Sequence, residues 1–230
     1  AMLMTTGHGP CRQGIYNLLN QITLERLGWA DRVRIWPPTD AGYFDDLPAG
    51  MAPLLFGAMV ASDLLLGALH EVRPEETRPG AALEIYQKYF ARLKETAESG
   101  GRTLSAGRAL WQLAGGELFG LRRLLAEAAA EFATIRSARD LPVVLLVGEI
   151  YVRCDPFAND FIVEKLEQRG LKARLAPVNE WLEYSDLITR RREVNIGMSA
   201  RVSSLVQQRI QNLLHDCMAP QFGWPGRPAV

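Results

Sequence analysis

The feature that most constrains the fold is a continuous apolar run at residues 142–148, Pro-Val-Val-Leu-Leu-Val-Gly. A short Val-rich run of this kind is typical of a strand in the centre of a parallel sheet, covered on both faces. The turn after it leads into a predicted helix over residues 156–169, with Asp155 as its cap and Pro156 in its first turn. A further strand at residues 172–176 completes a predicted βαβ unit with a right-handed crossover.

The N-terminal segment follows the same pattern. It predicts a strand at residues 3–6, a helix at residues 14–27 and a second strand at residues 32–36. Pro37 and Pro38 end that strand firmly, because proline cannot donate a ladder hydrogen bond. We therefore predict a second βαβ unit, again with two parallel strands.

The segment between the two units is predicted to be helical. Apolar residues at helical spacing indicate helices over residues 52–70, 81–98 and 105–135, the last interrupted near Gly115. The first of these stretches is strongly apolar but contains Asp63. We expect it to be a buried helix rather than a membrane span.

Together these patterns predict an α/β fold, a doubly wound, mostly parallel sheet built from two βαβ units with a helical insertion between them. The expected boundaries are residues 1–50 for the first unit, 51–140 for the insertion and 141–220 for the second unit with C-terminal helices. These form one compact domain or part of a larger protein. Ligands of such sheets bind beyond the carboxyl ends of the strands, so the loops at residues 7–14 and 149–159 should open at the same edge.

Composition narrows the class of protein. The chain carries 26 basic and 26 acidic residues among 230, so its formal net charge is zero. This balance argues against nucleic acid or an anionic membrane as a partner. Three widely spaced cysteines without a secretion signal favour a reducing cytoplasm over a disulfide framework. The chain begins directly in a strand-like run, which predicts a piece cut from a longer protein.

The first candidate site is the glycine-rich loop that holds Cys11, just before the N-terminal helix. Free backbone N–H groups and the helix dipole favour an anion there, either a thiolate or a bound cofactor. Gly9 and Gly14 allow close backbone approach, and the charge of Arg12 would lower a thiol pKa. Cys11 is therefore predicted to be a metal–sulfur ligand or a reactive thiol, and the alternative is a small buried residue at a tight turn.

The second candidate site is the loop after the apolar strand, where we single out Glu149, Arg153 and Asn159. These residues are expected either to contact a ligand or to form a Glu–Arg pair with helix capping. Cys154 lies in the same loop. The chain has no GxGxxG sequence, no Walker lysine, no GxSxG nucleophile elbow and no HExxH zinc motif, which excludes the standard sites of those kinds.

Several segments, taken together, are similar to one known family. They are Gly9-Pro10-Cys11-Arg12-x-Gly14-x-Tyr16, Val72-Arg73-Pro74-Glu75, Val147-Gly148-Glu149-Ile150-Tyr151-Val152-Arg153, Asp155-Pro156-Phe157-Ala158-Asn159, Glu167-x-x-Gly170 and Pro177-x-x-Glu180-Trp181-x-x-Tyr184. This combination resembles the 2-hydroxyacyl-CoA dehydratases and the activase-related proteins, including the component D-like dehydratase subunits and the double-cubane iron–sulfur proteins. The resemblance covers residues 7–184.

The resemblance implies oxygen-sensitive chemistry on a cysteine-ligated iron–sulfur cluster of the [4Fe–4S] class. It implies an ATP-dependent activator protein that delivers low-potential electrons, and an acyl-CoA substrate that loses its 2-hydroxyl group. On this chain Cys11 matches the metal ligand, and thiolate ligation of iron agrees with its place at a helix start. The cofactor-binding candidates are Gly9, Arg12, Gly14, Glu149, Arg153 and Asn159.

The chain also departs from the family pattern. Gln13 and Ile15 stand where an aromatic and a polar residue are expected, and Cys154 replaces a non-cysteine. The other cysteine segments of the family are missing, and one thiolate cannot hold a cubane cluster. We therefore expect the chain alone to be cluster-free, with the remaining ligands in the rest of the parent chain or in a partner subunit.

Two alternatives remain to the iron–sulfur interpretation. One is a non-catalytic α/β binding or assembly module in which Cys11 is structural. The other is an enzyme that uses Cys11 as a nucleophile, which requires a depressed thiol pKa.

Overall fold

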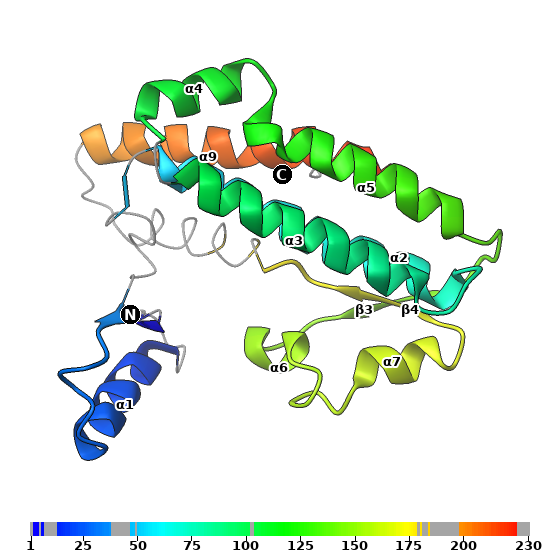
Figure 1. Cartoon of the computed structure of the whole chain (residues 1–230), viewed down its shortest axis with the longest axis horizontal. Coiled ribbons are helices and arrows are strands. Elements are labelled where there is room, and N and C mark those ends of the chain that lie inside the picture. The colour runs from blue at the N-terminus through cyan, green and yellow to red at the C-terminus, as the bar shows by residue number, and fades with distance from the viewer. Residues whose placement is uncertain are drawn as a thin grey trace.

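The computed structural model describes residues 2–4, 6, 13–37, 47–48, 50–101, 104–178, 180, 184 and 198–224. Within these ranges the protein is a mixed α/β structure, mostly helical, with short parallel strands in two small sheets. Figure 1 shows a layer of long helices above the second βαβ unit, and the N-terminal βαβ unit set apart from both.

The centre of the helical layer is α2 (Met51–Val72), which α3 (Ala81–Gly101), α5 (Leu121–Ile135) and α9 (Met198–Met218) pack against. A helix that is apolar on most of its surface is stable when other helices surround it. Gly57 of α2 allows close packing, since a Cβ there would lie 3.0 Å from Leu121 of α5 and 3.4 Å from Leu214 of α9. The predicted buried helix is confirmed.

One stretch of the described chain, Met51–Glu75, has the length and hydropathy to cross a membrane. Its apolar window has a mean hydropathy of 1.8, and half of that window is buried inside the protein. Its packing against three other helices gives these apolar residues a place in the core.

The predicted interruption of the 105–135 helix is confirmed. Helix α4 (Ala106–Ala114) begins at Ser105, whose side chain accepts a hydrogen bond from the backbone N–H of Arg108. The turn before α5 includes the short 3₁₀ helix Leu118–Gly120, with φ of 72° at Gly116 and 80° at Gly120. Glycine takes these left-handed conformations without steric cost, which lets the chain reverse direction.

The N-terminal unit consists of β1 (Met2–Leu3), α1 (Gln13–Arg26) and β2 (Ile35–Trp36). The two strands are parallel, with Met2 opposite Ile35. The predicted βαβ order is therefore confirmed, although both strands are shorter than the sequence pattern indicates.

The second unit contains β3 (Val143–Leu146), α6 (Ile150–Cys154), α7 (Ile162–Glu167) and β4 (Lys172–Leu175). Strands β3 and β4 are parallel along their full length, from Val143 opposite Lys172 to Leu146 opposite Leu175. Helix α2 packs against β4. The predicted parallel pair at residues 142–148 and 172–176 is thus confirmed.

The helix predicted over residues 156–169 is wrong in its first half. Residues 155–161 form turns between α6 and α7, and both Asp160 and Phe161 have positive φ, 56° and 54°. A right-handed helix cannot pass through two such residues. The Asp155 carboxylate accepts a hydrogen bond from the Ala158 N–H at 2.7 Å, so it stabilises the turn rather than a helix start.

The predicted burial of the apolar strand is also wrong within the described residues. Val143 is 47% exposed and Leu145 is 60% exposed. Strand β3 has a neighbour on one edge, β4, and the two described sheets, β1–β2 and β3–β4, are separate. The single doubly wound sheet, with both loops at one edge, is therefore not confirmed.

Candidate functional site

The predicted metal ligand Cys11 lies outside the described residues, as do Gly9 and Arg12. Helix α1 begins at Gln13, so this loop does lead directly into a helix, as the sequence predicts. Gly14 lies in the first turn of α1, and its carbonyl accepts a hydrogen bond from the Thr6 hydroxyl at 3.3 Å. The ligand role of Cys11 stays a prediction.

The three candidates in the second loop hold that loop in shape. The Glu149 carboxylate caps α6 by accepting a hydrogen bond from the Val152 N–H at 2.8 Å. Arg153 donates to the carbonyls of Gly148 at 3.0 Å and Pro177 at 3.3 Å, which ties α6 to the segment after β4. These contacts fix the loop around α6 without requiring a ligand.

Asn159 also stabilises this loop through side-chain hydrogen bonds. Its side-chain amide donates to the Arg153 carbonyl at 3.1 Å, and its oxygen accepts from the Ile162 N–H at 3.2 Å at the start of α7. The predicted capping role is therefore present in Glu149 and Asn159. Contact of these residues with a cofactor stays a prediction.

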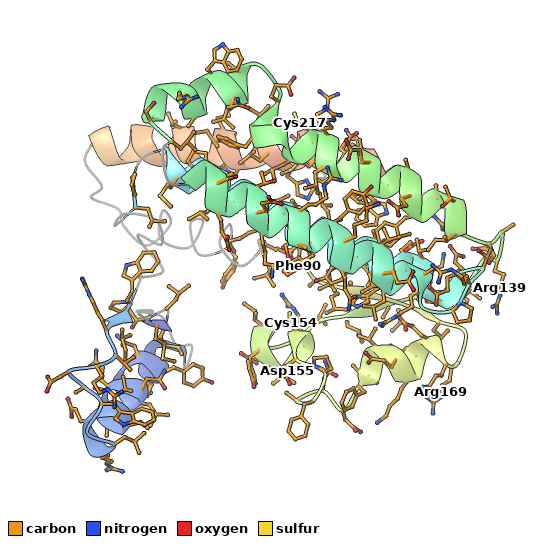
Figure 2. All side chains as sticks on the ribbon, in the orientation of Figure 1. Phe90, Arg139, Cys154, Asp155, Arg169 and Cys217 are labelled. Atoms are coloured by element: carbon orange, nitrogen blue, oxygen red, sulfur yellow. The ribbon has the colours of Figure 1, made fainter. Side chains whose placement is uncertain are left out.

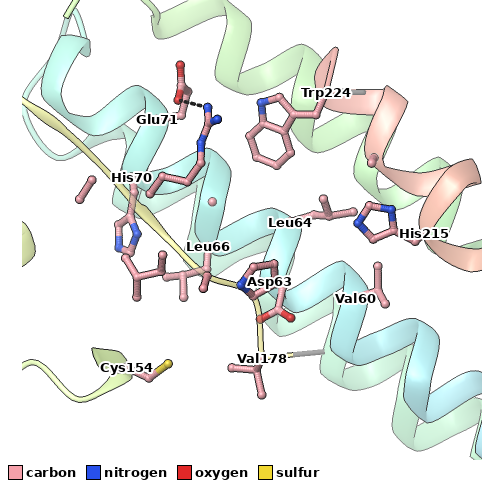
Figure 3. A pocket seen from close by; sticks show the side chains of 17 residues that line it. Val60, Asp63, Leu64, Leu66, His70, Glu71, Cys154, Val178, His215 and Trp224 are labelled. Carbon is pink, nitrogen blue, oxygen red and sulfur yellow. Dashed lines mark ion pairs between the residues drawn. The ribbon is translucent and has the colours of Figure 1, made fainter. Parts of the chain in front are cut away.

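The structure also contains a cavity of about 420 Å³ between α2, β4 and the C-terminal end of α9. Figure 3 shows its walls. Most of the lining is apolar and comes from Val60, Leu64, Leu66, Leu175, Val178 and Trp224. A volume of this size is in the range of small-molecule sites.

Two histidines line this cavity, His70 on α2 and His215 on α9. His70 is only 7% exposed, and the Nδ1 atoms of both rings are buried without a hydrogen-bond partner. Burial, with a contribution from the Arg73 charge, lowers the pKa of His70 to about 4. Burial also lowers the pKa of His215, against the opposing effect of Asp216. His70 is therefore neutral at physiological pH.

The thiol of Cys154 faces the same cavity (Figure 3). Partial burial raises the pKa of Cys154, an effect that Arg153 opposes and the carboxylates of Asp63 and Glu149 reinforce. Cys154 and Asp63 both line the cavity. The thiol carries its proton at neutral pH, which makes it a poor nucleophile.

An ion-pair network begins at Glu71 and Arg174, two residues that line the cavity. Glu71 pairs with Arg174 at 3.5 Å and with Lys172 at 3.1 Å. Lys172 also pairs at 3.2 Å with Glu75, which in turn pairs with Arg136. Lys172 and Glu75 are both buried, so each needs the other's charge. The network fixes β4 against the end of α2.

A second ion pair joins two segments of the family resemblance. Arg73 meets Glu167 of α7 through two contacts, Nε to Oε2 at 2.7 Å and Nη2 to Oε1 at 3.0 Å. Bidentate pairs of this kind combine strength with geometric specificity. Burial is the largest effect on Glu167 and raises its pKa, while Arg73 lowers it.

The cavity residues form no local motif in the sequence, although one signal is present. Asp63, Gly67 and His70 follow one another at spacings of four and three, which places them on one face of α2. The remaining walls come from β4 and α9, more than a hundred residues later. No local pattern connects them.

Across the described ranges, no group of three or more His, Cys, Asp or Glu side chains is placed to hold a metal ion. Neither a protein-family model, nor a curated protein sequence, nor a solved structure matches this chain.

Proposed function

We propose that this chain is the α/β part of a cytoplasmic iron–sulfur protein related to the 2-hydroxyacyl-CoA dehydratases and their activase-related proteins. The parent protein acts in low-potential electron transfer or reductive dehydration of an acyl-CoA, with an ATP-dependent activator as partner. Cys11 supplies one thiolate to the cluster, and Arg12 with the surrounding backbone N–H groups offsets cluster charge.

The contact between Arg73 and Glu167 carries this proposal. Both residues belong to segments that resemble the family, and the contact joins positions 94 residues apart in the chain. The contact of Arg153 with the Pro177 carbonyl joins two further segments of the resemblance. The resembling segments therefore meet in pairs in the folded chain, as a shared architecture would require.

The described residues do not form a cluster cage. Cys154 lies on the second βαβ unit and Cys217 in the helical layer, well apart in Figure 2. In this proposal the further cluster ligands belong to the rest of the parent chain or to a partner subunit.

Exposed apolar surface supports the need for such a partner. Strand β3 exposes Val143 and Leu145, followed by Val147 at 69%. Helix α1 exposes further large apolar residues, Ile15, Leu18, Leu19 and Ile22. Parallel sheets are normally covered on both faces, and exposed apolar strands are prone to association. As part of the proposal, additional protein covers these units and completes the doubly wound sheet.

The test is anaerobic reconstitution of the full-length parent protein with Cys11→Ser, measuring bound iron and sulfide. We expect the Cys11→Ser protein to lose most of both, and matched Cys154→Ser and Cys217→Ser proteins to keep them. Full iron and sulfide content in the Cys11→Ser protein would show that the ligand role is wrong.

The exposed apolar strand also favours a second candidate, a non-catalytic assembly module with a structural Cys11. In that case Cys11→Ala lowers the stability of the parent protein but leaves its cluster content and activity intact. The same reconstitution experiment separates the two functions.

A further inference from the structure

We infer that the cavity between α2, β4 and the C-terminal end of α9 binds a small uncharged hydrocarbon group, such as an aromatic ring system, through apolar contacts. This inference is independent of the cluster role of Cys11. It rests on the cavity's size, its apolar lining and the anchoring of its walls.

The size and the lining of the cavity are unusual for the inside of a protein. Protein interiors contain few voids larger than a water molecule, whereas this cavity has a volume of about 420 Å³. Much of its wall belongs to side chains that are at most 7% exposed: Val60, Leu64, Ala173 and Ala219. Apolar atoms that border a void lose dispersion contacts, and an apolar guest restores them without needing hydrogen bonds.

The walls are anchored separately, so they resist collapsing onto one another. The ring of Trp224 lies against Gly67 of α2, with a ring carbon 3.0 Å from the position of an added Cβ. Phe222 stacks on that ring at a centroid distance of 5.1 Å, which holds it in place. On the strand side, the buried pair of Lys172 and Glu75 fixes β4 against the end of α2. A cavity between fixed walls stays open, and a guest can fill it without rearranging the core.

The charged and titratable side chains of the lining are occupied within the protein. Glu71 and Arg174 pair with each other, and Asp63 also interacts within the protein. His70 and His215 are uncharged at pH 7.5 because burial lowers the pKa of both, and their Nδ1 atoms are buried. Apolar contact is therefore the main interaction that the described lining offers to a guest.

The experiment titrates the full chain with two probes, benzene and naphthalene, and follows the methyl groups of the protein by NMR at pH 7.5. We expect naphthalene to bind about tenfold more tightly than benzene, because it buries more apolar area in the same cavity. Intermolecular NOEs in the unaltered chain should connect bound naphthalene with the methyl groups of Val60, Leu64 and Val178. This readout does not depend on the folding of any variant.

Two variants test the location by reducing the free volume of the cavity. Val60→Phe and Val178→Phe each enlarge a lining side chain, and each should weaken naphthalene binding at least tenfold. Val60 is in the tightly packed core, whereas Val178 is partly exposed and tolerates the larger ring more readily. Val206→Phe is the matched control, since this residue of α9 is 52% exposed and does not line the cavity. It should leave the affinity unchanged.

Four results would overturn the inference. The first is no binding of either probe up to its solubility limit, and the second is benzene binding as tightly as naphthalene. The third is a set of NOEs that connects naphthalene only with exposed side chains such as Val143 and Leu145 of β3. The fourth is unchanged naphthalene affinity in both the Val60→Phe and the Val178→Phe proteins.

Discussion

At the scale of single residues, the buried histidine of α2 has a clear energetic consequence. The pKa of His70 is about 4 in the folded protein and close to 6.5 in the unfolded chain. Between these values the unfolded chain binds a proton that the folded protein does not. Stability is therefore complete above pH 6.5 and falls as the pH drops toward 4.

The first prediction concerns this proton. The free energy of unfolding of the unaltered chain should fall by about 2 kcal/mol between pH 7 and pH 4.5 because of His70. The His70→Phe variant should lack this part of the decrease, since phenylalanine has no proton to bind. Urea unfolding of both proteins at the two pH values measures the difference. An equal loss in both proteins would contradict the assigned burial.

At the scale of elements, Arg73 and Glu167 connect the end of α2 to α7 of the second βαβ unit. Burial is the largest effect on the pKa of Glu167 and raises it, whereas Arg73 lowers it, so desolvation opposes the pair's attraction. Partly buried pairs of this kind stabilise little overall, but removing one partner leaves the other charge unpaired.

The second prediction follows from that imbalance. Arg73→Met and Glu167→Met should each destabilise the chain by about 2 kcal/mol, while the double variant should lie within about 1 kcal/mol of the original. Urea unfolding of the four proteins gives the coupling energy. The exposed pair of Arg78 and Glu84 is a matched control and should show a smaller coupling. Additive effects of the two Met substitutions would refute the coupling.

Sequence patterns predicted some helices correctly and missed other local structure. Helical periodicity located α1, α2, α3 and α5, because apolar residues recur at helical spacing in each of these segments. The same approach missed the turns between α6 and α7. Asp160 and Phe161 adopt left-handed conformations, but their residue types do not signal this in the sequence. The turn around them is held by hydrogen bonds that the Asp155 and Asn159 side chains accept from the backbone.

The candidate sites also differ in how far the sequence alone identifies them. The loop around Glu149 and Arg153 could be identified from the sequence because it directly follows the apolar strand at residues 142–148. The cavity could not be identified from the sequence. His70 and His215 lie 145 positions apart in the chain, and only tertiary packing brings them to the same cavity. The ligand role of Cys11 lies outside the described residues and rests on sequence resemblance alone.

At the scale of the whole molecule, apolar surface is distributed unevenly. The helical layer buries a large apolar core around α2, although α4 exposes Leu110 and Trp111. The two βαβ units leave many of their large apolar side chains exposed. Strand β3 has one paired edge and an apolar outer face in the described structure. Soluble proteins rarely leave such a face uncovered.

The third prediction is that the chain self-associates through this strand when produced alone. Sedimentation velocity should show a weight-average size that rises with protein concentration, and Leu145→Lys should reduce this rise without lowering thermal stability. The control is Leu110→Lys on α4, which is similarly exposed but lies in the helical layer. A concentration-independent monomer in the unaltered chain would count against the exposed strand as an interface.

The position of α9 has a consequence for how the chain reaches this structure. Leu214 and Met218 of α9 are fully buried against α2 and α5, yet they follow the second βαβ unit in the chain. During synthesis, α2, α3 and α5 leave the ribosome well before the helix that completes their core. Their apolar faces stay open while residues 143–175 emerge and fold as an insert, a period when contact with other chains is most harmful. Synthesis rate and chaperone supply should therefore govern the yield of this protein more than its final stability does.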